Sequence, residues 1–326
     1  MKLTLAGVIL VCVAFAQNGG REFLKLEATV PMPEVRGRID HLAIDATGGR
    51  LFVAALGNNT MEIIDLKKAS RIHTVSGLAE PQGIVYIPSA QRVFVANGRD
   101  GSVRGFDTVS WAPLKSISFG DDADNLRVDP DTGHLWVGYG SGALAEFDLD
   151  GAKLGEIKLS AHPESFQLEK GGHRGYVNLP KSRKVDVIDR ESRTVSKSWD
   201  MGLTLSNYPM ALDQANHRLF VVTRVPARLI VFDTSDGRKI ATLATSGDCD
   251  DVFFDQNRRR IYAIGGEGAI AVFEQSDPDH YKELGRIKTV SGARTGLFSP
   301  TTDRLYLAVR KHESQSAEIR VYAPAQ

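Results

Sequence analysis

The chain has 326 residues, and its 40 basic and 40 acidic side chains cancel at neutral pH. This balance provides no net field that would attract nucleic acid or an anionic membrane, so we expect neither as a partner. Two cysteines are present, Cys12 and Cys249, and the first lies in an apolar leader. The mature chain therefore has no second thiol for an intrachain disulfide, and its stability must come from core burial.

The leader has the pattern of a signal peptide. Lys2 precedes an apolar run over residues 3–15, and an Ala-Phe-Ala sequence ends at residue 16. Small residues at these two positions suit signal peptidase, and the run is too short to anchor the chain in a bilayer. We expect residues 1–16 to be removed and residues 17–326 to form one domain, periplasmic or secreted, without stable membrane insertion.

A strand is expected next, over residues 23–30. Apolar residues alternate there with polar ones: Leu24, Leu26, Ala28 and Val30 against Lys25, Glu27 and Thr29. Such alternation is typical of a half-buried strand.

A sevenfold repeat fills the remainder of the chain. Each copy has a basic residue, then a small or hydrophobic one, an aromatic one and usually Val, beginning at Arg50, Arg92, His134, Arg174, Arg218, Arg260 and Arg304. The steps are 42, 42, 40, 44, 42 and 44 residues. This period suits a four-stranded propeller blade, which buries its apolar face only when neighbouring blades stack on it.

The first copy shows the order of strands within a blade. Residues 41–45, 51–55, 61–65 and 71–75 read as the innermost, second, third and outer strands, with turn residues between them. The third strand commonly ends in Asp, at Asp65, Asp107, Asp148, Asp189 and Asp233. We interpret these aspartates as turn caps.

The seventh blade lacks an outer strand of its own, because only four residues follow Tyr322. We expect residues 23–30 to supply it and so close the ring. The predicted fold is an all-β, seven-bladed β-propeller with four-stranded antiparallel blades, and we expect a monomer.

Several second strands end in a recognisable pattern: Phe94-Val-Ala-Asn97, Tyr176-Val-Asn178 and Phe220-Val-Val-Thr223. These endings resemble the YVTN repeat of the YncE-like seven-bladed β-propellers. The resemblance implies the fold and a binding or scaffold role. Related propellers include gluconolactonase-type lactonases, streptogramin B lyases and heavy chains of periplasmic amine dehydrogenases, and the fold by itself does not choose among them.

The innermost strands surround a central channel, so equivalent first positions form a ring at one mouth. These pairs are Asp40-His41, Gln82-Gly83, Asp124-Asn125, Glu164-Ser165, Tyr208-Pro209, Asp250-Asp251 and Arg294-Thr295. We expect loops between second and third strands to add Asn97 and Glu267, among others. The predicted ligand-binding residues are Asp40, Asn97, Asp124, Asn125, Glu164, Asp250, Asp251, Glu267 and Arg294.

Carboxylates that converge on one mouth repel one another and need a metal ion, Arg294 or bound protons as counter-charge. One hypothesis is a divalent cation held by Asp124, Asn125, Glu164 and Asp251, whose oxygen ligands suit Ca²⁺ or Mg²⁺. Participation of His41 or His162 would favour Zn²⁺ or a transition metal instead. In the alternative, these groups hydrogen-bond one another and water in a wet channel.

His41 follows a carboxylate at a first ring position, which makes it a candidate general base, although a histidine that satisfies local backbone groups would look the same. In the sixth copy, acids flank Cys249 and should raise its pKa, which argues against a nucleophilic thiolate.

The sequence therefore predicts an exported propeller that binds a small ligand or divalent metal at its mouth, as a binding or scaffold protein. Its partner would be a small molecule or another exported protein. The alternative is a metal-assisted lactone hydrolase or lyase, and a third possibility is a subunit of a periplasmic redox complex.

Overall fold

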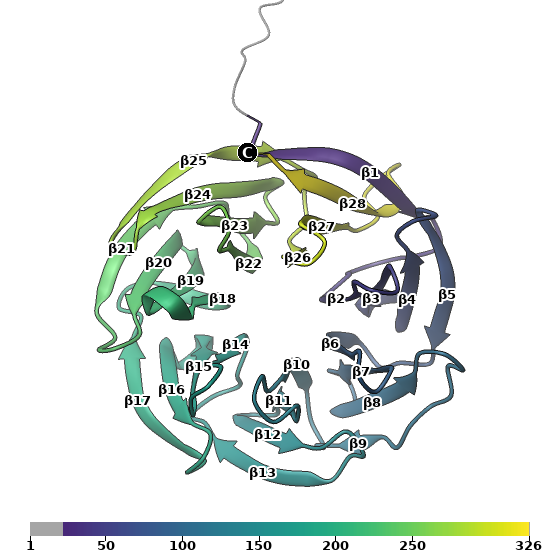
Figure 1. Cartoon of the computed structure of the whole chain (residues 1–326), viewed down its shortest axis with the longest axis horizontal. Coiled ribbons are helices and arrows are strands. Elements are labelled where there is room, and N and C mark those ends of the chain that lie inside the picture. Colours follow the sequence, from purple (N-terminus) through teal and green to yellow (C-terminus); the bar gives the residue numbers. More distant parts are fainter. Residues whose placement is uncertain (1–21, 326) are drawn as a thin grey trace, which may run out of the picture.

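Seven four-stranded antiparallel sheets surround a central channel in the computed structural model, which describes residues 22–325 (Figure 1). The predicted propeller is confirmed. The signal peptide predicted at residues 1–16 lies outside the described residues and stays a prediction. Within residues 22–325 no helix has the length and hydropathy that a membrane crossing requires.

Blades one to four follow the chain from inside to outside. Blade one has β2 (Leu42–Asp45), β3 (Arg50–Ala55), β4 (Thr60–Asp65) and β5 (Ser70–Ser76). Blade two has β6 (Pro81–Ile87), β7 (Arg92–Asn97), β8 (Ser102–Asp107) and β9 (Ile117–Ser118). Blade three has β10 (Ala123–Val128), β11 (Leu135–Tyr139), β12 (Ala143–Phe147) and β13 (Lys153–Lys158). Blade four has β14 (Phe166–Leu168), β15 (Arg174–Leu179), β16 (Lys184–Asp189) and β17 (Thr194–Asp200).

Blades five to seven complete the ring. Blade five has β18 (Leu205–Asp213), β19 (Arg218–Val225), β20 (Ala227–Asp233) and β21 (Lys239–Ala244). Blade six has β22 (Cys249–Asp255), β23 (Arg260–Gly265), β24 (Ala269–Asp277) and β25 (His280–Lys288). Blade seven has β26 (Thr295–Ser299), β27 (Arg304–Val309), β28 (Ala317–Pro324) and β1 (Leu24–Met32). Three short 3₁₀ helices lie in connections: η1 (Leu56–Asn58), η2 (Pro180–Ser182) and η3 (Gln214–Asn216).

The N-terminal strand closes the ring as predicted. β1 pairs antiparallel with β28, from Leu24 opposite Pro324 to Met32 opposite Ala317, two residues past the predicted end at residue 30. Met32 is fully buried in a cluster shared with blade one. The strand therefore caps the edge of blade seven and also packs against its neighbour.

The aromatic residue of each repeat is buried between blades. Phe52, Phe94, Trp136, Tyr176, Phe220, Tyr262 and Tyr306 are all at most 2 % exposed. Phe52, for example, belongs to one apolar cluster with Ile84 and Val93 of the next blade. Each blade thus completes its core only through its neighbour, as the repeat length implies.

The basic residue of the repeat connects neighbouring blades. Arg50 donates to the backbone oxygen of Thr108 at 2.7 Å, in the turn that follows the third strand of blade two. Arg92, Arg174, Arg218 and Arg260 make the equivalent bond to the next blade, to Leu149, Thr234, Pro278 and Ala325. Two positions differ: His134 contacts Glu146, and Arg304 pairs with Glu27.

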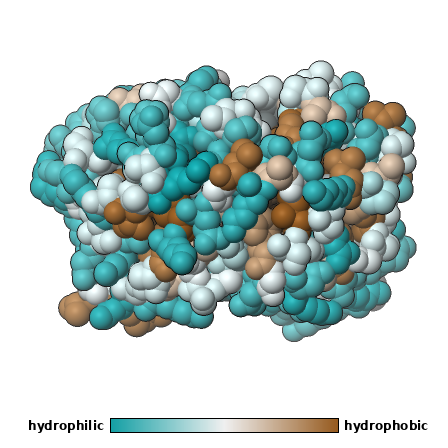
Figure 2. Space-filling model, turned by 90° about the horizontal axis from the view of Figure 1, so that it is seen from below, coloured by the Kyte–Doolittle hydropathy of each residue, from teal (hydrophilic) through white to brown (hydrophobic). Residues whose placement is uncertain are grey.

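The aspartates that end third strands are turn caps, as predicted. Asp65 accepts from the Lys67 backbone N–H at 2.9 Å, and Asp107 from that of Ser110 at 2.7 Å. Asp148, Asp189 and Asp233 make the corresponding bonds in their own blades. Figure 2 shows the edge of the disc, where hydrophilic side chains predominate and hydrophobic ones form small patches.

Candidate metal centre in the channel mouth

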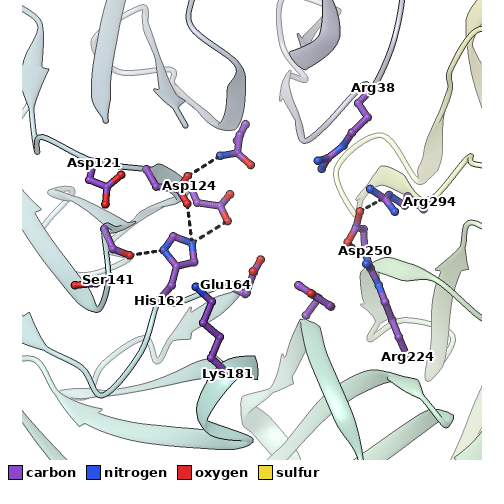
Figure 3. A pocket seen from close by; sticks show the side chains of 14 residues that line it. Arg38, Asp121, Asp124, Ser141, His162, Glu164, Lys181, Arg224, Asp250 and Arg294 are labelled. Carbon is purple, nitrogen blue, oxygen red and sulfur yellow. Dashed lines mark hydrogen bonds and ion pairs between the residues drawn. The ribbon is translucent and has the colours of Figure 1, made fainter. Parts of the chain in front are cut away.

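The seven inner strands begin at the same end of the channel, where their first residues line a cavity of about 440 Å³, here called the mouth cavity (Figure 3). The predicted ring positions that line it are Gln82, Asp124, Glu164, Tyr208, Asp250 and Arg294. A narrower pocket of about 40 Å³ shares several of these residues and also contacts Asp40, His41, Asn125 and Ser165. The ring arrangement expected from the repeat is therefore present.

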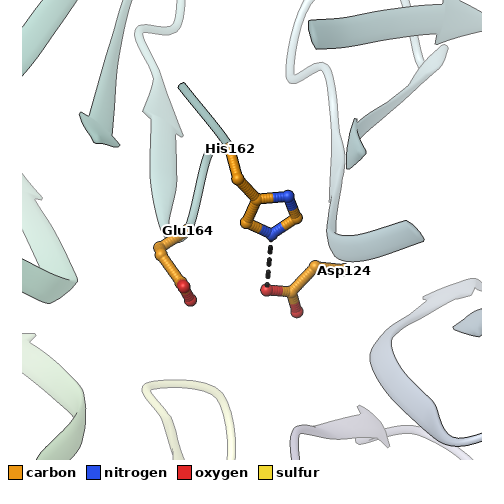
Figure 4. A group of neighbouring side chains, drawn as sticks. All are labelled: Asp124, His162 and Glu164. Carbon is orange, nitrogen blue, oxygen red and sulfur yellow. Dashed lines mark ion pairs between the residues drawn. The ribbon is translucent and has the colours of Figure 1, made fainter. Parts of the chain in front are cut away.

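Acidic and imidazole groups gather on one wall of the mouth cavity. Asp124 lies on β10 of blade three, and His162 and Glu164 lie in the segment that leads into β14 of blade four. One ligand atom from each residue can be chosen so that all three lie within 4.8 Å of one another (Figure 4). We call these three residues the metal cluster.

His162 is oriented by the backbone. Its Nδ1 lies 2.6 Å from the carbonyl oxygen of Gly140, and a carbonyl only accepts, so Nδ1 carries a proton. Nε2 faces Oδ2 of Asp124 at 3.6 Å and Oδ2 of Asp122 at 3.8 Å. A backbone carbonyl that fixes one ring nitrogen while the other faces carboxylates is the usual setting of a metal-bound histidine. The residues present therefore fit a divalent cation.

In the absence of a cation, protons balance the charge of the metal cluster. Burial, and then the charge of Asp124, raises the pKa of Glu164 to about 8. For His162, burial lowers the pKa, but the contacts with Asp124 and the Gly140 carbonyl outweigh it and raise the pKa to about 9. Both groups thus hold protons at neutral pH, and a bound cation would take their place.

Arginines occupy the opposite wall. Arg294 pairs with Asp250 at 2.6 Å and with Asp248 at 3.0 Å, and Arg224 pairs with the same two aspartates. The Arg224 guanidinium also lies 4.1 Å from the centre of the Tyr208 ring. Asp250 is therefore neutralised by arginine, whereas the metal cluster on the other wall has no arginine in its ion pairs within residues 22–325.

His41 lies deeper in the channel and serves as a counter-charge. Its Nδ1 is 3.5 Å from Asp251, its Nε2 is 3.7 Å from Asp40, and Nδ2 of Asn125 is 3.3 Å from Nε2. Burial lowers the pKa of His41, but Asp251 and Asp40 outweigh it and raise the pKa to about 10. Carboxylates near both ring nitrogens favour the charged imidazole, which is a poor general base, and the catalytic role of His41 stays a prediction.

The predicted metal set is divided between two places. Asp124 and Glu164 belong to the metal cluster, whereas Asn125 and Asp251 contact His41. Asp251 also accepts the Gly296 backbone N–H at 2.9 Å. His162, which the sequence offered only as an alternative ligand, completes the cluster.

Three predicted ligand-binding residues line neither pocket of the mouth: Asn97, Asp251 and Glu267. Asn97 is fully buried, and its side chain accepts from the Ala79 N–H at 3.0 Å and donates to the Val95 carbonyl. These bonds hold the backbone around β7 in place and leave the side chain turned away from the mouth pockets. Glu267 is exposed and pairs with Arg286 at 3.3 Å. Asn97 is the last residue of β7 and Glu267 follows β23, so the ends of second strands supply fewer groups to the mouth than the sequence suggested.

Comparisons with known proteins support the fold more strongly than any activity. The chain is a seven-bladed β-propeller. It is similar to a chain in a structure of hydrazine synthase from Kuenenia stuttgartiensis, with a TM-score of 0.75 and 17 % identity over 88 % of this chain and 97 % of that one. It is also similar to a chain of the mitotic checkpoint complex, with a TM-score of 0.79 and 13 % identity over 100 % of both chains. At such identities the likeness shows the fold alone.

Sequence comparisons cover only parts of this propeller. A family model described as arylesterase matches residues 50–146, which include Asp124 but neither His162 nor Glu164. Protein NEDD1 of Mus musculus is 24 % identical over 167 residues, or 49 % of this chain. The match spans 25 % of the length of that curated relative. The YVTN pattern remains a resemblance.

Proposed function

We propose that this propeller binds one divalent cation through Asp124, His162 and Glu164, and that a small molecule in the mouth cavity binds to that cation. The observation that carries the proposal is the close approach of three ligand atoms, within 4.8 Å, in a cluster whose histidine is fixed by a backbone carbonyl. Arg224 and Arg294 form ion pairs with Asp248 and Asp250, so they do not neutralise the carboxylates of the metal cluster.

The donor set favours Zn²⁺ over Ca²⁺. Imidazole nitrogen suits zinc, whereas calcium prefers six or more oxygen ligands. Three protein ligands leave a coordination position for water or for a bound molecule, as in catalytic zinc sites. The mouth cavity of about 440 Å³ beside the cluster has room for such a molecule. In this proposal the protein is an exported binding protein, as the YncE-like resemblance implies.

Metal-assisted hydrolysis of an ester or lactone is a second candidate, favoured by the arylesterase match over residues 50–146. A cation of this kind polarises a carbonyl and lowers the pKa of bound water. The chain itself would hold the cation through the metal cluster. Arg38 and Tyr208 line the same cavity and would contact the substrate.

The test is the metal content of the exported protein, measured by plasma mass spectrometry for the wild type and for Asp124→Asn and Glu164→Gln. We expect about one zinc per chain in the wild type and at least tenfold less in both variants. Glu267→Gln is the matched control, because its carboxylate pairs with Arg286 outside the cavity. A metal-free wild type, or equal metal in the variants, would refute the proposal; calcium in place of zinc would refute the choice of ion.

Hydrolysis is tested separately with phenyl acetate and a γ-lactone. Turnover that is abolished by exhaustive chelation and restored by the metal supports the second candidate. Turnover that survives chelation contradicts metal-assisted hydrolysis. Metal binding without turnover would support the binding protein and not the hydrolase.

A further inference from the structure

A second cavity lies further along the inner strands, away from the mouth. It measures about 190 Å³ and is lined by residues of β10, β14, β18, β22 and β26, all of which surround the channel in Figure 1. We call it the far chamber. None of its lining residues belongs to the metal cluster or lines the mouth cavity.

Arg127 places a positive charge in the far chamber. Its Nη1 donates to the carbonyl oxygen of its neighbour Leu126 at 3.0 Å, and its guanidinium lies 5.8 Å from the centre of the Phe166 ring. Among residues 22–325 no carboxylate forms a salt bridge with it, unlike the arginines of the mouth. A guanidinium has five N–H donors, so most of its hydrogen-bonding capacity is unused by the protein.

The acids around Arg127 are engaged elsewhere. Asp251, which also lines the chamber, accepts the Gly296 N–H through Oδ2 and faces the His41 imidazole through Oδ1. Asp124 belongs to the metal cluster. Burial lowers the pKa of Arg127 despite the attraction of both carboxylates, which indicates a charge that its surroundings do not fully compensate.

Polar and apolar groups share the rest of the lining, with Ser165, Gln167 and Asp251 on the polar side. Phe253, Phe254 and Phe298 line the chamber together with Met210 and Val252. Its volume exceeds the roughly 150 Å³ of an engineered protein cavity that binds benzene. A single guanidinium among three aromatic rings suits a molecule with one anionic group and a small apolar body.

The far chamber also has an entrance. It shares Leu212, Phe254 and Pro300 with an adjoining groove of about 570 Å³. Lys170 lines that groove, and among the described residues it takes part in no salt bridge. Asp213 and Asp255, the acids of the groove, are engaged by Gln275 and Arg258. Lys170 and Arg258 offset the charges of these two acids, so the approach from this side does not exclude an anion.

We propose that the far chamber binds a small organic monocarboxylate, with its carboxylate on Arg127 and its apolar body against Phe253, Phe254 and Phe298. Arginine receives a carboxylate through two parallel hydrogen bonds, which the unused donors of Arg127 allow. This site is independent of the metal proposed for the mouth.

The experiment measures binding of benzoate to the chelator-treated protein by titration calorimetry. Benzamide has the same shape without the charge, and acetate has the charge without the ring. We expect benzoate to bind at least tenfold more tightly than either of them. Arg127→Gln should weaken benzoate binding at least tenfold, whereas Arg99→Gln should not, because Arg99 is exposed and pairs with Glu80.

Three outcomes would overturn the proposal: no benzoate binding by the wild type, equal binding of benzamide, or benzoate binding that survives Arg127→Gln. Binding that is lost in Arg38→Gln but kept in Arg127→Gln would place the carboxylate in the mouth cavity, which Arg38 lines, and would also overturn the proposal. The benzoate and benzamide comparison needs only wild-type protein, so the proposal can fail even if Arg127→Gln does not fold.

Discussion

Two histidines in the same channel differ because different groups hold their second nitrogen. Nδ1 of His162 bonds a neutral carbonyl and leaves Nε2 toward the mouth cavity, whereas His41 has carboxylates near both nitrogens, Asp251 and Asp40. The first arrangement favours metal ligation and the second favours a stored positive charge. Residue type alone does not distinguish them.

The stored charge on His41 predicts a pH-dependent stability. Its pKa rises from an ordinary 6.5 to about 10 on folding, with Asp251, Asp40 and Arg127 as the charged groups that face it. The stabilisation is fully present below pH 6.5 and is lost as pH rises through the folded pKa. Each pH unit in this window costs about 1.4 kcal/mol of unfolding free energy.

The pH dependence of the unfolding free energy can be measured by urea unfolding of the chelator-treated protein between pH 6 and 10, with His41→Gln as the comparison. The difference in stability between wild type and variant should shrink as pH rises. A difference that stays constant over this range would contradict the charged state of His41.

Cys249 should be unreactive in the folded protein. It is fully buried, its Sγ lies 3.1 Å from the Ser246 carbonyl oxygen, and burial raises the pKa of its thiol. Since the thiolate is the reactive form, a thiol reagent such as dithionitrobenzoate should modify it only after unfolding. Rapid modification of the native exported protein would contradict the burial of the Cys249 thiol.

At the scale of the structural element, the basic residue of the repeat has a role that its regular spacing only hinted at. Arg50 bonds Asp45 of its own blade and the Thr108 carbonyl of the next, and it lies 5.6 Å from the Phe52 ring. The motif thus combines an inter-blade hydrogen bond with inter-blade aromatic packing. A blade is held to its neighbour by polar and apolar contacts from the same strand.

Arg50→Met should therefore destabilise the protein. It removes the bond to Thr108 and leaves the carboxylate of Asp45 without its ion-pair partner, which together should cost about 2 to 3 kcal/mol. Denaturant unfolding measures this loss. Arg99→Met is the control, because its exposed pair with Glu80 should contribute less than about 1 kcal/mol. Equal losses in the two variants would deny the inter-blade role.

At the scale of the whole molecule, closure depends on one strand from the opposite end of the chain. β1 pairs with β28 along its length and buries Leu24, Val30 and Met32. Without β1, strand β28 would be an unpaired edge of blade seven, and the N-terminal and C-terminal parts of the ring would no longer be held together by strand pairing.

A chain that begins after Met32 should have a melting temperature lower by about 10 °C or more, and one that begins at Glu22 should not. Thermal unfolding followed by circular dichroism measures both. An unchanged melting temperature in the shorter chain would mean that the ring is stable without β1.

The sequence by itself determined the number of blades, the order of their strands, the closing strand and the ring of first positions. These follow from local alternation and a fixed repeat, because hydrogen-bond register and inter-blade packing act on every copy alike. Asp124 and Glu164 were found at the mouth for that reason.

Only the tertiary structure decided which acids meet which counter-charge. The repeat places Asp124, Asp250 and Asp251 at equivalent levels, yet one faces His162, one faces arginines and one faces His41. His162 comes from a connecting segment outside the repeat pattern. Asn97 accepts a hydrogen bond from the backbone N–H of Ala79 and does not reach the mouth. Electrostatic pairing depends on distances of a few ångströms between side chains from different blades, and a sequence period does not contain those distances.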